Sequence, residues 1–135
     1  MQSLSERYET LQKTLKQLDV ALKKSRLEKS GDYFDLFRDT AIHRFNLCVR
    51  PFWKYLKVYL DKMGVKVEDD NPRVVFDACM NKELITKKEF ELFAHMVEDA
   101  ARLDYAHNQN IAEEIYLKIP RYYDSMKNIL GRHTV

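Results

Sequence analysis

The amino-acid sequence predicts an all-α protein, an up-and-down antiparallel bundle of four to five helices in one domain spanning residues 1–135. Three observations support this prediction. Only three glycines and three prolines occur in 135 residues, too few for a fold built on many tight turns. Apolar side chains recur at helical spacing in five segments, and the connectors between these segments are short. The length suits one domain with a sizeable core better than two.

The first half of the chain is expected to form two long helices. Over residues 3–29, apolar side chains from Leu4 to Leu22 alternate four and three positions apart, which gives one apolar stripe. Gly31 follows as a residue suited to the left-handed conformation that ends a helix. Residues 33–63 keep helical spacing with an aromatic-rich face, and at 1.5 Å per residue this helix is about 45 Å long.

Two further expectations concern this long second helix. Pro51 lies inside it, and the missing backbone bond should kink the helix or split it near Cys48. A helix of this length exceeds what a compact monomer of 135 residues needs. Its aromatic side chains, Phe52 and Trp53 together with the adjacent Arg50, are therefore predicted to face a partner chain or a second copy in a dimer.

Capping signals predict three shorter helices in the second half. The pair Asn71-Pro72 reads as a cap followed by proline at the first helical position. Residues 86–89 match a capping box, so a fourth helix starts there and should end within residues 105–109. Asn108 or Asn110 caps the last helix. A proline at position 120 should kink or break that helix in turn.

Composition narrows the function classes. The net charge of +2 gives no strong global field for collecting nucleic acid. Cys48 and Cys79 lack metal-ligand spacing, so they are expected to be buried free thiols in a reducing cytoplasm. The N-terminus is too polar for a signal peptide, and no apolar stretch is long enough to span a membrane. No metal site, cofactor, glycine-rich phosphate loop or nucleophile elbow is expected. Basic residues near positions 23–29 and 118–132 are expected to be solvated helix faces.

Arg102 and His107 are the first candidates for a functional site, because a guanidinium and an imidazole can cleave RNA without a metal. The spacing alone is weak evidence, since Arg38 and His43 repeat it. On a continuous helix a step of five residues separates two side chains by about 140°, so Arg38 and His43 should not converge.

Several segments, in this order, resemble one protein family. They are residues 38–45, residues 52–60, residues 71–75, the pair Arg102 and His107, and residues 112–120. In order and spacing the chain resembles the HEPN family of small helical proteins, and within it the nucleotidyltransferase substrate-binding branch that includes HepT-type toxins.

The resemblance implies a partner and a location for the site. It implies a homodimer whose interface holds two copies of the Arg102–His107 motif, a separate minimal nucleotidyltransferase as partner, and RNA or a nucleotide as ligand. It also implies that the Arg38–His43 pair is incidental, since glutamine is common in the family at position 43.

The sequence departs from the family pattern near the motif. Leu103 stands where a polar residue is usual, and Gln109 stands where HepT-type toxins often carry a tyrosine that the partner modifies. The nearest tyrosine is Tyr105, inside the motif. Arg50 replaces an acidic residue common before the tryptophan. These departures put modification at the usual site, and full nuclease activity, in question, but not the fold.

Two functional hypotheses follow, and a third holds that the chain only assembles with partners. In the first, the chain is a metal-independent endoribonuclease: His107 is the general base on a ribose 2′-hydroxyl and Arg102 stabilises the phosphorane. Asp104 would orient His107 or pair with Arg102, with Tyr105 and Asn108 in support. In the second, the same residues bind a nucleotide or substrate for the partner enzyme without cleaving it. In the third, the polar pair is only a structural hydrogen bond.

Overall fold

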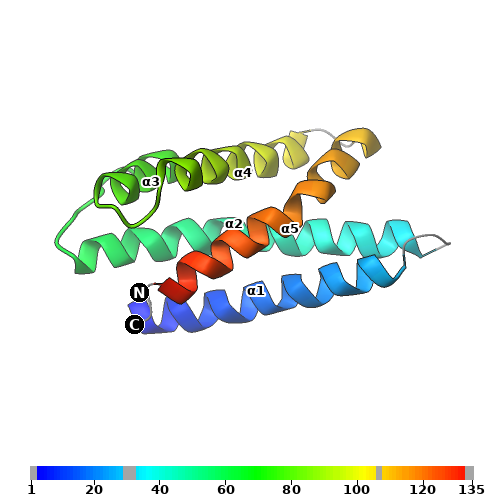
Figure 1. Ribbon diagram of the computed structural model, residues 1–135, viewed down its shortest axis with the longest axis horizontal. Coiled ribbons are helices and arrows are strands. Elements are labelled where there is room, and N and C mark those ends of the chain that lie inside the picture. The colour runs from blue at the N-terminus through cyan, green and yellow to red at the C-terminus, as the bar shows by residue number, and fades with distance from the viewer. Residues whose placement is uncertain (1–2, 29–32, 106–107, 133–135) are drawn as a thin grey trace.

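The computed structural model describes residues 3–28, 33–105 and 108–132, and all regular structure in these ranges is helical (Figure 1). Five helices follow one another, which confirms the all-helical prediction. Gly31 and His107 lie outside the described residues. The helices are α1 (Leu4–Leu27), α2 (Phe34–Lys62), α3 (Pro72–Asn81), α4 (Lys87–Tyr105) and α5 (Gln109–Arg132).

Local capping chemistry sets the starts of the last three helices, as the sequence predicted. The Asn71 side chain accepts a hydrogen bond from the backbone N–H of Arg73, with proline next in the chain. Thr86 and Glu89 exchange the two bonds of a capping box at the start of α4. Asn108, rather than the alternative Asn110, caps α5, because its Oδ1 accepts the backbone N–H of Asn110 at 2.8 Å.

Both long helices that contain a proline continue through it. Pro51 lies inside the 29 residues of α2 and Pro120 inside the 24 residues of α5. The alternatives of a split near Cys48 and a break at Pro120 are therefore wrong, while the two kinks stay predictions. A proline removes one backbone bond, and packing of the surrounding turns against neighbouring helices outweighs that local cost.

The helices pack in three layers, with α2 and α5 in the middle. Along the described chain α1 contacts α2 and α5 but neither α3 nor α4, whereas α2 contacts every other helix. Figure 1 shows α1 and α2 side by side and antiparallel, with α5 crossing them diagonally so that its end lies near the start of α1. This diagonal return covers the aromatic face of α2.

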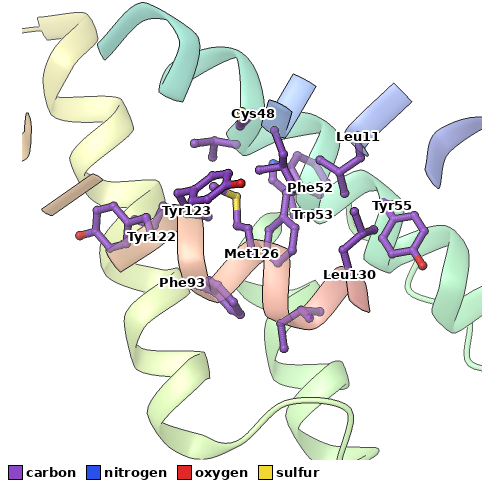
Figure 2. Close-up of a cluster of buried hydrophobic side chains, with 14 of the residues drawn as sticks. Leu11, Cys48, Phe52, Trp53, Tyr55, Phe93, Tyr122, Tyr123, Met126 and Leu130 are labelled. Atoms are coloured by element: carbon purple, nitrogen blue, oxygen red, sulfur yellow. The ribbon is translucent and has the colours of Figure 1, made fainter. Parts of the chain in front are cut away.

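The core is rich in aromatic rings from α2, α3, α4 and α5, and Figure 2 shows a part of this cluster around Phe52 and Phe93. The Phe52 ring centroid lies 4.9 Å from that of Phe93, and the Phe45 ring stacks on Tyr122 at 5.6 Å. Phe52 is fully buried and Trp53 is only 7% exposed. The chain's own helices therefore cover these two side chains, and their place at an interface with a second chain stays a prediction. Arg50 is exposed, and its place at an interface stays a prediction.

Candidate functional site

Arg102 lies in the last turn of α4 and is bound by carboxylates from two helices. Its Nη1 donates to Asp99 Oδ1 at 3.2 Å and to Glu114 Oε2 at 2.7 Å. The hydrogen bond to Glu114, followed by the charge of Glu114 and the contact with Asp99, raises the pKa of the Arg102 guanidinium. The positive charge that a phosphate would need is thus already shared between two anions.

Asp99 organises the contact between α4 and α5. It is 4% exposed, and its Oδ2 accepts a hydrogen bond from the Tyr122 hydroxyl at 2.5 Å and one from Lys118 Nζ at 3.4 Å. Burial, and next the bond to Asp99, raise the pKa of the Tyr122 hydroxyl. Asp99, Arg102, Glu114, Lys118 and Tyr122 are called the Asp99 cluster below.

The sequence interpretation missed the Asp99 cluster. One signal was available: Asp99 stands three residues before Arg102, where a helix places two side chains next to each other. The partners on α5 carry no such signal, because they are brought in by tertiary packing.

The other predicted site residues are only partly described by the structure. Tyr105 is the last residue of α4, and the predicted end of this helix is confirmed. Asp104 is exposed. Among the described residues, the carboxylates bonded to Arg102 are those of Asp99 and Glu114, not that of Asp104. Orientation of His107 by Asp104 concerns a residue outside the described ranges.

A second polar site lies beside the junction of α4 and α5. A pocket of about 430 Å³ opens between α2 and the start of α5, and it is called the α2–α5 pocket below. Its volume is within the range of sites for small molecules. Arg102 is not among its described lining residues. The pocket is lined by Arg38, Asp39, Ile42, His43, Asn46, Leu103, Asn108, Gln109 and Ala112.

The α2–α5 pocket brings the second Arg–His pair into the candidate site. Arg38 is 4% exposed, and its guanidinium pairs with Asp39 at 3.3 Å and with Glu113 at 3.2 Å. It also lies 5.9 Å from the centre of the Phe34 ring. His43 is exposed on the same pocket wall. The helical step does separate the two residues, yet both border one pocket, so His43 has a setting that the sequence interpretation set aside.

Comparison with known proteins places the chain in a family. A crystal structure of a protein from Thermus thermophilus is 30% identical, with a TM-score of 0.69 over 85% of this chain and 97% of that chain. No curated protein matches. The family described as "Nucleotidyltransferase substrate binding protein like" matches residues 6–134. The chain belongs to this family.

In this nucleotidyltransferase substrate-binding-like protein the family match covers all five helices, apart from the first two residues of α1. This agrees with the family resemblance of the sequence motifs. Within the described residues, no three His, Cys, Asp or Glu side chains are grouped so that they could hold a metal ion. None of the helices in the same ranges is long and apolar enough to cross a membrane.

Proposed function

We propose that this chain is the substrate-binding partner of a separate nucleotidyltransferase, and that the α2–α5 pocket holds the nucleotide part of the substrate. The observation that carries the proposal is the make-up of the pocket wall. Asn46 and Gln109 each present an amide with two donors and an acceptor, and Asn108, whose Oδ1 caps α5, presents its two N–H donors. Such groups match the hydrogen-bonding edges of a nucleobase.

The remaining lining residues suit the same ligand. Ile42 and Leu103 supply an apolar wall against which a flat base can lie. Leu103, a departure from the family pattern, thereby acquires a role in the pocket. The Arg38 guanidinium, held by Asp39 and Glu113, fixes the polar end of the wall instead of offering a free positive charge. The pocket therefore recognises a base and sugar more readily than a phosphate.

Titration with a fluorescent ATP analogue tests this proposal, and two matched histidine variants make the test specific. His43→Ala removes an exposed imidazole from the pocket, and His95→Ala removes an exposed imidazole elsewhere, on α4. Loss of one good hydrogen bond or stacking contact should weaken binding about tenfold in His43→Ala, and His95→Ala should bind as wild type. Equal affinities for all three proteins would show that the α2–α5 pocket does not bind the nucleotide.

The partner is tested separately. We expect a neighbouring gene to encode a nucleotidyltransferase, and co-expression of the two proteins should give a stable complex on size-exclusion chromatography. The nucleotidyl transfer should then depend on the α2–α5 pocket, so His43→Ala should raise the KM for the nucleotide and leave complex formation unchanged. A nucleotidyltransferase that works at full rate without this chain would contradict the proposal.

A metal-independent endoribonuclease is the second candidate function, favoured by the Arg102–His107 spacing in the sequence and by the place of Arg102 in the last turn of α4. His107 would take the proton of a ribose 2′-hydroxyl, whose oxygen attacks the adjacent phosphorus. The 5′-oxygen would leave as a hydroxyl and a 2′,3′-cyclic phosphate would remain. The bonds from Arg102 to Asp99 and Glu114 weigh against this candidate, because two carboxylates already neutralise the charge that would attract a phosphate.

Incubation with total RNA in EDTA tests the nuclease candidate. The candidate requires cleavage that His107→Ala abolishes and that Glu114→Gln increases, since the neutral amide frees Arg102 for phosphate. If the RNA stays intact with both wild type and Glu114→Gln, the nuclease candidate fails and only the substrate-binding function remains.

Light scattering tests the homodimer that the family resemblance implies. A strict monomer would exclude a cleft composed of two copies of the motif.

A further inference from the structure

The outer ridge of α1 separates two hollows, and neither shares a lining residue with the α2–α5 pocket. Lys13 and Lys16 stand on this ridge, are exposed, and line both hollows. The first hollow, of about 560 Å³, lies between α1 and α5. The second, of about 490 Å³, lies between α1 and α2. A ligand that crosses the ridge would contact the same two ammonium groups from either side.

The first hollow combines aromatic walls with positive charge. Tyr8 and Tyr123 line it, as do Leu15 and Leu130. A third lysine, Lys127, joins the two ridge lysines, and its Nζ lies 5.9 Å from the centre of the Tyr123 ring. Flat rings beside ammonium groups suit a base that stacks while its phosphate is neutralised.

The second hollow is cationic without a balancing anion. Lys24 and Arg44 join the two ridge lysines, and no carboxylate is present among the described residues that line it. Arg44 is held in place because its Nη1 donates to Gln17 Oε1 at 3.0 Å. The carboxylate of the first hollow, Asp19, lies 2.9 Å from Lys23 and is paired with it. The two hollows together therefore hold five cations and one paired anion, in a chain whose net charge is only +2.

We propose that these two hollows form one binding site for single-stranded nucleic acid, with a base in the tyrosine-lined hollow and the backbone phosphates over Lys13, Lys16 and Arg44. The ridge from residue 13 to residue 24 is about 16 Å long, which suits several consecutive nucleotides. An acidic protein surface would satisfy the cations but would leave the apolar tyrosine hollow unfilled. The combination of a positive track with stacking rings favours nucleic acid.

The site is separate from the pocket proposed for the nucleotide, since the two share no lining residue. It would let this chain hold an extended substrate while the α2–α5 pocket holds one nucleotide. The two proposals can fail independently.

Fluorescence anisotropy with a labelled oligouridylate of about 12 nucleotides tests the site. Phosphate contacts from Lys13, Lys16 and Arg44 give a salt slope of about −2.1, so binding should weaken about twentyfold between about 50 and about 200 mM salt. Lys13→Glu/Lys16→Glu should weaken binding at least tenfold. The control Lys87→Glu/Lys88→Glu changes the net charge equally, on exposed residues at the start of α4, and should bind as wild type.

Two more variants separate stacking from charge and control for a change outside the site. Tyr8→Leu keeps an apolar side chain but removes the ring, and should weaken binding about tenfold with an unchanged salt slope. His95→Ala, which changes an exposed residue of α4 outside both hollows and outside the α2–α5 pocket, should bind the oligonucleotide as wild type. Three results would overturn the proposal: no binding at low salt, equal losses in the two double variants, or displacement of the oligonucleotide by oligoglutamate at equal concentration.

Discussion

Replacement of Asp99 should destabilise the protein more than most single changes. Asp99 is 4% exposed and accepts hydrogen bonds from Tyr122, Arg102 and Lys118. The bond from the buried Tyr122 hydroxyl to a carboxylate contributes about 1.5–3 kcal/mol. The side chains of Arg102 and Lys118 are over 40% exposed, so solvent screens their contacts with Asp99 and these contribute less than the bond from Tyr122. Asp99→Ala should therefore cost about 3–4 kcal/mol, and Asp99→Asn, which keeps the volume and one acceptor, about 2 kcal/mol.

Urea denaturation followed by circular dichroism measures both costs, and a double-mutant cycle assigns them. Tyr122→Phe alone should cost about 1–2 kcal/mol. Combined with Asp99→Asn it should cost less than the sum, because both changes remove the same bond. In a domain of this size about 3 kcal/mol lowers the Tm by about 12 °C. An Asp99→Asn protein within about 0.5 kcal/mol of wild type would refute the central role of this carboxylate.

Three further predictions concern stability. Burial raises the pKa of the Cys48 and Cys79 thiols from 9.0 to about 12, so their contribution to the free energy of unfolding should be fully present below pH 9.0 and fall as the pH rises toward 12. Within this window each thiol lowers the free energy of unfolding by about 1.4 kcal/mol per pH unit. The slope of stability against pH, measured by urea denaturation, should therefore be smaller in Cys48→Ala/Cys79→Ala. Gly64 has a φ of +86°, so Gly64→Ala should lower the free energy of unfolding by about 1 kcal/mol in the same assay, although open space surrounds the new methyl. Thr86→Ala breaks the capping box with Glu89 and should cost about 1 kcal/mol, with lost helical signal on thermal melting.

Features set by neighbouring residues could be predicted from the sequence. The caps at Asn71 and Thr86 and the start of α5 after Asn108 depend on side chains within three positions of the backbone that they satisfy. Because these interactions are local, a single sequence contains all the information that they need. The helical periodicity of the core-facing residues is local in the same sense.

Features set by distant residues could not be predicted. A periodic stripe shows that Phe52 and Trp53 must be covered, but not whether the cover is another copy or the chain's own helices. Here the chain's own helices supply the cover: Phe52 packs against Phe76 of α3 and Phe93 of α4, and α5 crosses α2 diagonally. The Asp99 cluster and the α2–α5 pocket depend likewise on how α5 meets α4 and α2. The same holds for Pro51. The cost of its missing backbone hydrogen bond is visible in the sequence, but the packing against neighbouring helices that outweighs this cost is not.

The environment of Arg102 bears directly on which function the family member performs. A guanidinium that serves a phosphorane must offer donors that are free when the charge develops. The charge of Arg102 is instead paired with Glu114 on α5 and with Asp99 on its own helix, and the bond from Nη1 to Glu114 ties α4 to α5 beside the α2–α5 pocket. In this arrangement the arginine stabilises the helix junction from which Leu103, Asn108 and Gln109 reach into the pocket wall. The same residue that suggests catalysis in the sequence is thus, in the structure, better suited to position a binding site.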